Sequence, residues 1–246
     1  MKLKVIAYAR NGHTDKFGIP RQSRDESPIV TRIVFEPEYC VREAVRGLEG
    51  FSHLWLIWGF SEVQRDDVQG TKEWSPTVRP PRLGGNKRVG VFATRSPFRP
   101  NPLGLSSVRL IRIQYSEVSR QMELIVSGAD LMNGTPIYDI KPYLSYSDSH
   151  EDAKNGFAEA TKDYHLEVVW ESGSRETLDL HRSFIGNSSD IHPITLRDEI
   201  EYILSQDPRP AYQDDPDREY KMDFGGWRVV FKVEKSTIFV KKLEKI

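Results

Sequence analysis

Short hydrophobic runs, separated by turn residues, fill the first 145 residues of the chain. Apolar and β-branched residues concentrate in seven stretches, and Gly, Pro, Asn or Asp interrupts the chain between them. The stretches are Val5–Tyr8, Ile29–Phe35, Phe51–Phe60, Arg88–Thr94, Leu103–Ile113, Met122–Val126 and Pro136–Tyr143. Seven short strands favour an all-β barrel or sandwich over a parallel α/β fold. A short helix is predicted over Glu38–Arg46, because its apolar residues share one face and Gly47 can end it.

A polar, turn-rich stretch, Ser145–Ala160, follows these strands and is the predicted boundary between a domain of residues 1–150 and one of residues 160–246. The second domain is expected to contain a strand, a helix and a hairpin, over Tyr164–Trp170, Thr195–Gln206, and Trp227–Val233 with Thr237–Lys242. Thr195 and Asp198 have the spacing of a capping box at the start of that helix. The predicted fold is therefore mainly β, an antiparallel β-barrel followed by a smaller α+β domain.

Composition excludes several classes of protein. Lys and Arg total 35 and Asp and Glu total 36, so the net charge of −1 excludes a uniformly basic nucleic-acid-binding coat. The single cysteine, Cys40, excludes an intrachain disulfide and a cysteine-based metal site, and the six histidines lack metal-ligand spacing. The longest uncharged apolar run, Phe51–Phe60, is too short to span a bilayer. We expect a cytoplasmic protein with no membrane segment and no bound metal.

Familiar nucleotide-binding and hydrolase motifs do not occur in the sequence. There is no G-x-x-x-x-G-K-[ST] phosphate loop, no G-x-G-x-x-G dinucleotide fingerprint and no G-x-S-x-G nucleophile elbow. His53, inside the longest apolar run, is interpreted as a hydrogen-bonded barrel residue, with a role in a site as the alternative. Candidate chemistry must therefore be sought in other clusters.

Charge is unevenly distributed along the chain. Between Trp74 and Ser116 there are eight Lys and Arg residues and no Asp or Glu, so the rest of the chain carries −9. Such segregation is typical of a surface that meets phosphate groups, and a solvated strand face is the alternative, above all for Arg109 and Arg112. This basic segment contains Arg79, Arg82, Lys87, Arg88, Arg95, Arg99, Arg109 and Arg112.

The centre of the basic segment alternates proline and glycine with arginine. Residues 79–104 read RPPRLGGNKRVGVFATRSPFRPNPLG, which predicts a strand between two rigid loops. The second loop presents Arg95, Arg99 and Asn101 at the end of that strand. A stiff loop keeps such side chains ordered for a ligand at a low cost in conformational entropy.

Two further clusters carry charged and aromatic side chains. After an Asn-Gly turn, three side chains fall at every second position and share one strand face, namely Asp139, Lys141 and Tyr143. They form either part of a site or a salt-bridged surface. In the run DPRPAY, Arg209 can hold a phosphate and Tyr212 can stack on a base. The alternative is that this run only ends the preceding helix.

Five runs of sequence resemble the TsaA/TrmO-type family, in particular its full-length bacterial tRNA methyltransferases. The runs are FGIPRQ, AVRGLEGFSHLW, TVRPPRLGGNKRVGVFATRSPFRPNPLG, GTPIYDIKPY and DPRPAY. The resemblance implies a β-barrel in place of a Rossmann domain, S-adenosylmethionine as the cofactor and a homodimer. It also implies methylation of N6 of threonylcarbamoyladenosine at position 37 of tRNA, next to the anticodon.

The same resemblance implies a set of cofactor-binding residues. The sequence departs from the family pattern at the pair Ser61-Glu62, where His-Gln is common, at Asn133, where an acidic residue is common, and at Ala7, where glycine is usual. The implied cofactor-binding residues are Pro20, Arg21, Gln22, Ser61, Glu62, Arg95, Leu105, Asn133, Gly134, Thr135 and Pro136.

Methyl transfer to N6 requires alignment of the nitrogen with the methyl group and removal of the N6 proton. Asp139 is the candidate general base. The threonyl carboxylate of the substrate needs a cation, for which arginine is well suited, and the anticodon-stem phosphates are the expected partner of the basic segment. The candidate substrate-binding residues are Arg82, Arg99, Asn101, Lys141, Tyr143, Arg209 and Tyr212.

Two other functions are open on the sequence alone. One is a methyltransferase of the same family with another RNA or a small molecule as its substrate, which a product assay would distinguish. The other is a non-catalytic barrel that binds RNA, for which no binding of S-adenosylmethionine is expected.

Overall fold

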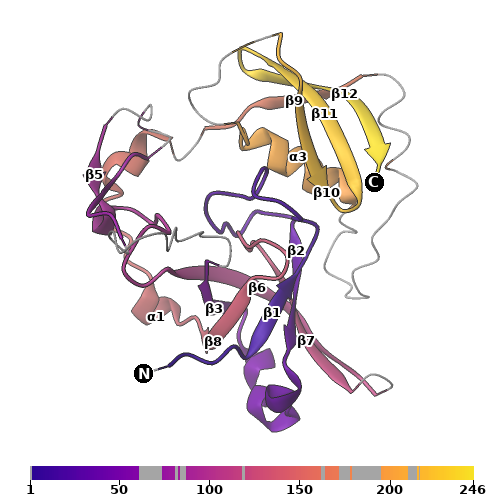
Figure 1. The fold of residues 1–246 in the computed structure, drawn as a ribbon. Coiled ribbons are helices and arrows are strands. Elements are labelled where there is room, and N and C mark those ends of the chain that lie inside the picture. Colours follow the sequence, from indigo (N-terminus) through magenta and orange to yellow (C-terminus); the bar gives the residue numbers. More distant parts are fainter. Residues whose placement is uncertain are drawn as a thin grey trace, which may run out of the picture.

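Six described strands close into an antiparallel barrel in the computed structural model, which confirms the predicted fold class (Figure 1). Their spatial order is β1-β2-β7-β6-β3-β8. Their bounds are Ala7–Arg10 (β1), Val30–Phe35 (β2), His53–Gly59 (β3), Leu103–Ser116 (β6), Gln121–Ser127 (β7) and Pro136–Pro142 (β8). The structure describes residues 2–60, 74–80, 83, 87–117, 120–161, 164–171, 178, 195–209, 215 and 217–246.

Alternation of buried and more exposed residues, clearest on β2 and β3, separates the interior of the barrel from its exterior, whereas β7 is buried on both faces from Met122 to Ser127. On β3, Leu54 and Leu56 are fully buried, whereas Trp55 and Ile57 stay partly exposed. Inward side chains of all these strands form one apolar core, which includes Ala7, Ile33, Leu54, Val108, Leu124 and Ile137. This period of two, with one face buried, is the reason that strands such as β2 and β3 are readable from the sequence.

The helix predicted over Glu38–Arg46 is wrong. The chain instead forms three short 3-10 turns, Pro37–Tyr39 (η1), Arg42–Val45 (η2) and Leu48–Gly50 (η3). Val41 has an extended backbone, with φ −117° and ψ 119°, and its side chain is 45% exposed. Because Val41 is β-branched and gains no burial here, a continuous helix has little to stabilise it.

The strand predicted over Arg88–Thr94 is only partly correct. Val89–Gly90 (β5) pairs with Thr77–Val78 (β4) in a two-stranded antiparallel sheet. The next three residues, Val91–Ala93 (η5), form a 3-10 turn, in which Val91 is buried. The basic segment therefore contributes a small separate sheet and then enters the barrel at β6.

The C-terminal part of the chain forms a second sheet with its own core. Its strand order is β10-β11-β12-β9, with bounds Tyr220–Phe224 (β10), Trp227–Glu234 (β11), Thr237–Lys245 (β12) and Glu167–Trp170 (β9). The predicted hairpin is confirmed as β11 and β12, whereas β10 was not predicted. The predicted helix is present as Leu196–Ser205 (α3), with the capping box of Thr195 and Asp198. Two short helices, Ser145–Asp148 (α1) and Gly156–Thr161 (η6), lie in the predicted boundary stretch.

The loop between β1 and β2, residues 11–29, connects the two cores. It lies between the barrel and the C-terminal sheet, on the side where α3 packs (Figure 1). Ile29 is fully buried in the C-terminal core, and Phe17 packs against the same core. The backbone N–H of Gly225 donates to the carbonyl of Gly12 at 3.1 Å. We refer to residues 11–29 as the bridging loop, because a segment of the N-terminal sequence completes the C-terminal core.

Candidate functional site

A buried carboxyl group, that of Asp130, joins several segments that carry predicted cofactor-binding residues. Asp130 accepts a hydrogen bond from the hydroxyl of Ser106 on β6 at 2.5 Å and another from the backbone of Ser23 in the bridging loop. Arg95 lies close enough to interact electrostatically with Asp130, and it donates a hydrogen bond to the side chain of Gln22. We name Gln22, Ser23, Arg95, Ser106 and Asp130 the Asp130 cluster.

Burial raises the pKa of Asp130, while its hydrogen bonds and the charge of Arg95 act in the opposite direction. The indole N–H of Trp58 donates to the hydroxyl of Ser106 at 2.9 Å, so the cluster is anchored in the barrel core. Asp130 is not among the site residues predicted from the sequence. The available signal was an acidic residue in the short segment between the apolar run that ends at Ser127 and the Asn-Gly turn at residues 133 and 134.

The turn that contains Asn133 and Gly134 lies beside the end of β1. Gly134 has φ +85°, and its N–H donates to the carbonyl of Ala9 at 2.8 Å. The N–H of Asn133 donates to the carbonyl of His13 at 2.8 Å, which holds the turn against the bridging loop. A Cβ added at Gly134 would meet only Arg10 Nη1 within 4 Å, at 3.9 Å, so this side of the turn is open. Thr135 and Pro136 continue from the turn into β8, and Thr135 is buried.

Arg21 and Arg209 lie together, although 188 residues separate them in the sequence. The guanidinium of Arg21 donates to the backbone carbonyl of Arg209 at 3.0 Å. Arg209 itself is buried, 7% exposed, and its Nε lies 2.8 Å from Oδ1 of Asp207. The carbonyl of Arg209 therefore holds the guanidinium of Arg21 in place, and the carboxylate of Asp207 balances the charge of Arg209. Pro20, which precedes Arg21, is buried as well.

The outer face of β3 and β8 carries the second predicted group. Asp139 and Lys141 are cross-strand neighbours of Ile57 and Trp55, and Lys141 Nζ lies 3.3 Å from Asp139 Oδ2. The ring of Tyr143 lies 5.5 Å from that of Trp55. The predicted common face of Asp139, Lys141 and Tyr143 is thus present, with the ion pair of the salt-bridged alternative. Leu105 of β6, 54% exposed, pairs with Ile57 on the same face.

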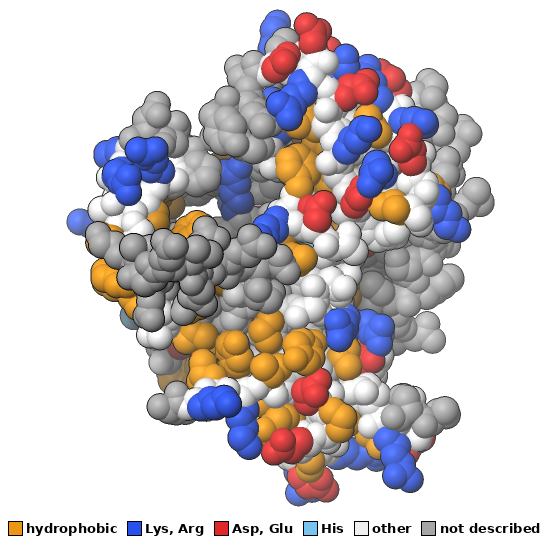
Figure 2. Space-filling view, viewed as in Figure 1, with side chains coloured by type: hydrophobic (Ala, Val, Ile, Leu, Met, Phe, Trp, Pro, Cys, Tyr) orange, Lys and Arg blue, Asp and Glu red, His pale blue; other side chains and the backbone are white. Residues whose placement is uncertain are grey.

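Basic side chains gather over the β4–β5 sheet on the face shown in Figure 2. Arg99, further along the segment, donates from Nη2 to the carbonyls of Val91 and Thr94 at 3.2 and 2.7 Å. Its Nε is a buried nitrogen without a hydrogen-bond partner among the described residues. Asn101 is exposed at the start of the approach to β6.

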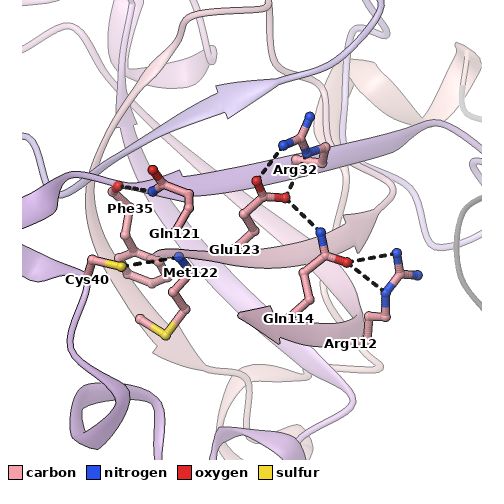
Figure 3. Close-up of polar contacts among 8 residues, drawn as sticks. All are labelled: Arg32, Phe35, Cys40, Arg112, Gln114, Gln121, Met122 and Glu123. Carbon is pink, nitrogen blue, oxygen red and sulfur yellow. Dashed lines mark hydrogen bonds and ion pairs between the residues drawn. The ribbon is translucent and has the colours of Figure 1, made fainter. Parts of the chain in front are cut away.

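Two arginines of the basic segment lie in polar networks on the strands. Arg109 donates to Asp25 of the bridging loop at 2.9 Å, and His53 Nε2 lies 2.9 Å from the same carboxylate, so the barrel-residue interpretation fits His53. The Arg109 guanidinium and His53 lower the pKa of Asp25 to about 2. Arg112 donates to Gln114, which donates in turn to Glu123 (Figure 3). The strand-face interpretation therefore suits Arg109 and Arg112.

Figure 3 shows how this second network crosses three barrel strands. Glu123 on β7 also accepts two hydrogen bonds from the guanidinium of Arg32 on β2. The Arg32 guanidinium lowers the pKa of Glu123, so the pair is ionised at neutral pH. Cys40 has a structural contact here, since its sulfur accepts the N–H of Met122 at 3.2 Å.

Four predicted site residues lie outside the described residues, namely Ser61, Glu62, Arg82 and Tyr212. Within the part of the chain that is described, no group of three or more His, Cys, Asp or Glu side chains could hold a metal ion. None of the described helices is long and apolar enough to cross a membrane.

Comparison with known proteins places the chain among tRNA-modifying enzymes. The tRNA-methyltransferase O N-terminal domain matches residues 8–149, and the TrmO C-terminal domain matches residues 164–246. The tRNA (adenine(37)-N6)-methyltransferase of Eikenella corrodens is 46% identical over 77% of this chain and 95% of its own length. A putative S-adenosylmethionine-dependent methyltransferase of Pseudomonas aeruginosa is 40% identical, over 87% of this chain and 85% of its own.

The fold agrees with these sequence relationships. The crystal structure of TrmO from Pseudomonas aeruginosa superimposes with a TM-score of 0.75 and 30% identity, and the match covers 99% of this chain and 98% of that one. The resemblance of the five sequence runs, the barrel and both matched domains lead to the same conclusion. The chain belongs to the tRNA-methyltransferase O family.

Proposed function

We propose that this protein is an S-adenosylmethionine-dependent methyltransferase that methylates N6 of adenine 37 in tRNA, with threonylcarbamoyladenosine as the nucleoside that it modifies. Two named relatives carry this proposal, the tRNA (adenine(37)-N6)-methyltransferase and the S-adenosylmethionine-dependent methyltransferase. The single structural observation that supports it most is the Asp130 cluster, which gathers Gln22 and Arg95 around one buried carboxyl.

The residues of the proposed site fit such a cofactor in their chemistry. The open side of the Gly134 turn leaves room beside its backbone, and the amide of Gln22 and the guanidinium of Arg95 supply donors and acceptors for polar groups. We assign Pro20, Arg21, Gln22, Arg95, Leu105 and the residues Asn133 to Pro136 to this role. S-adenosylmethionine, when bound, supplies a methyl group activated by a positively charged sulfur.

The task of this chain's residues is to align the nucleophile and to take up its proton. N6 of the modified adenine is a weak nucleophile, and its attack becomes favourable only as its proton is removed. Asp139 is our candidate proton acceptor, and Lys141 lies beside it as a cation for the carboxylate of the threonyl group. Arg99, Asn101 and Tyr143 are the other described candidates for substrate contacts.

The quaternary structure and cellular setting belong to the same proposal. We infer a homodimer from the resemblance of the sequence runs to the TsaA/TrmO-type family. Light scattering of the purified protein tests this inference. We further propose that residues 1–150 and 160–246 form two domains, with the bridging loop of the first packed into the core of the second, and that the protein acts in the cytoplasm, where its tRNA substrate is found.

One assay tests substrate and reaction together. The protein is incubated with labelled S-adenosylmethionine and with tRNA from two sources, one that carries threonylcarbamoyladenosine and one from cells unable to make it. Digestion and mass analysis of the nucleosides then locate the methyl group. We expect a gain of one methyl group on the threonylcarbamoylated nucleoside alone. Methylation of neither tRNA, with cofactor bound, would point to another substrate within the family.

A further inference from the structure

Three large aromatic side chains of the basic segment are exposed to solvent. Phe92, Phe98 and Trp74 are 75%, 58% and 39% exposed, and we name these three residues the aromatic patch. The rings of Trp74 and Phe92 stack, with their centroids 6.0 Å apart and their planes at 28°. Exposed aromatic surface is unfavourable in water, and a cluster of it marks an interaction site.

The backbone that carries the aromatic patch is held in place by internal contacts. Val91, directly before Phe92, is 1% exposed and anchors the 3-10 turn. The guanidinium of Arg99 donates to the carbonyls of Val91 and Thr94, which ties the loop of Phe98 to the turn of Phe92. Rings on such a braced backbone lose little conformational freedom when a ligand binds.

Positive charge surrounds the aromatic patch. Val78 pairs with Val89 at the end of the β4–β5 ladder, so Arg79 and Arg88 follow at the same end of the sheet, and Arg88 Nε donates to the hydroxyl of Thr77 at 2.9 Å. Both arginines are exposed, as is Lys87, and the stretch from Trp74 to Ser116 contains no Asp or Glu. Figure 2 shows the resulting cluster of basic side chains over this sheet. Exposed cations in a stretch without acidic residues create a positive potential that attracts an anion.

We propose that the aromatic patch, together with Arg79, Lys87 and Arg88, binds unpaired nucleotides of RNA. Bases stack on the rings of the patch, and the phosphates that link them lie against the cations. The flat faces of bases are free for such stacking in single-stranded loops, because in a stem the bases stack on one another. This inference rests on the proposed function and assigns a single-stranded loop of the tRNA substrate to this surface.

Binding of a short unstructured RNA, unmodified and labelled with a fluorophore, tests the proposal without any methyl transfer. Alanine replacement of Phe92 or Phe98 should weaken binding by about 5- to 100-fold, because each ring stacks one base. The slope of affinity against salt concentration should stay the same in these variants. Arg88→Gln should instead reduce that slope by about 0.7, the value for one lost phosphate contact on a single strand.

Tyr146→Ala is the matched control, since Tyr146 is 86% exposed on α1 and lies outside the basic segment. It should leave RNA affinity unchanged, and thermal melting should show that every variant is folded. Unchanged RNA affinity in Phe92→Ala and Phe98→Ala overturns the proposal, as does equal affinity for a fully paired duplex. A change in oligomeric state without a change in RNA affinity also overturns it and assigns the patch to a protein partner. If RNA stacking is found while no tRNA is methylated, the proposed function fails and this inference stands.

Discussion

Glu199 on α3 accepts a hydrogen bond from the backbone N–H of Val30 on β2, with 3.0 Å between the carboxylate oxygen and the nitrogen. Glu199 is 7% exposed, and its burial raises its pKa to about 7. A helix of the C-terminal core is therefore joined to a barrel strand through a carboxyl group that titrates near neutral pH. The protonation state of this one side chain affects the stability of the contact.

Ionisation of Glu199 should destabilise the native chain as the pH rises. Unfolding returns the carboxyl to its ordinary pKa of 4.5, so between pH 4.5 and about 7 the native state holds a proton that the unfolded state releases. The stabilisation is complete below pH 4.5 and is lost as the pH rises through about 7. Its size is about 3 kcal/mol in the free energy of unfolding.

Glu199→Gln tests this expectation, because the amide keeps the acceptor for Val30 and cannot ionise. Urea unfolding is measured at about pH 5 and about pH 8, on either side of the transition. Relative to the wild type, the free energy of unfolding of the variant should rise by about 2–3 kcal/mol from pH 5 to pH 8. Glu234→Gln, at the exposed β11–β12 hairpin, is the control and should show no such gain. A difference between Glu199→Gln and wild type that does not vary with pH would contradict the argument.

His13 should act on stability in the opposite sense. It is 1% exposed and packs edge-on against Phe224 at 4.8 Å, and burial lowers its pKa from 6.5 to about 4. As the pH falls from 6.5 towards 4, the unfolded chain gains a proton that the native state resists, so stability is lost. In His13→Phe this loss should be absent from urea unfolding measured over that range. If the variant and the wild type lose stability in parallel, His13 is not the group responsible.

Barrel strands such as β2 and β3 were predictable because one face of each is buried, which imposes an alternating pattern that a sequence displays directly. The strand β7, buried on both faces, was predictable as a short run of apolar residues. β10, with its burial pattern of alternate residues, carries the same signal and could have been found. The helix expected over Glu38–Arg46 failed for a different reason. Its apolar spacing was helical, but only Val45 and Leu48 pack against the barrel core, whereas Val41 of the same stripe lies exposed on the surface.

One part of the candidate site could be predicted from the sequence and another part could not. The strand face of Asp139 and Lys141 follows from a period of two within one element and was predicted. The Asp130 cluster depends on partners from the bridging loop, the basic segment and β6, which are brought together only by closure of the barrel. The charge count of the basic segment likewise gave no indication that Arg109 pairs with Asp25, 84 residues away.

Gly104 is a position where the barrel core admits no side chain. A Cβ at this residue would lie 2.2 Å from Cε2 of Trp58. Gly104→Ala should therefore displace the Trp58 ring and destabilise the protein by about 1–3 kcal/mol, measured by urea unfolding. Gly90→Ala is the matched control, because a Cβ there meets nothing within 4 Å. Equal stability of the two variants would show that the ring moves without cost.

Asp130→Asn should weaken cofactor binding more than it weakens the fold. The amide keeps the size of the side chain and an acceptor for Ser106, but it loses the negative charge that faces Arg95. We expect the Kd for S-adenosylmethionine, measured by calorimetry, to rise by about tenfold, the effect of losing one charge-assisted contact. The melting temperature should change little. A variant with normal cofactor affinity would remove Asp130 from the proposed cofactor site.

Asp139→Asn tests the candidate proton acceptor, because it breaks the ion pair with Lys141 on the outer face of the barrel and leaves the Asp130 cluster intact. If Asp139 takes the N6 proton, single-turnover methyl transfer to tRNA should fall by about 10²–10⁴-fold, with the Kd for S-adenosylmethionine unchanged. Lys141→Gln is the companion variant. Loss of the contact between Lys141 and the substrate carboxylate should raise the KM for tRNA and leave the pH profile of the rate unchanged. Full turnover in Asp139→Asn would exclude Asp139 as the base, because a neutral amide cannot accept the proton. The acceptor would then have to be another group, and the buried carboxyl of Asp130 is the next one to test.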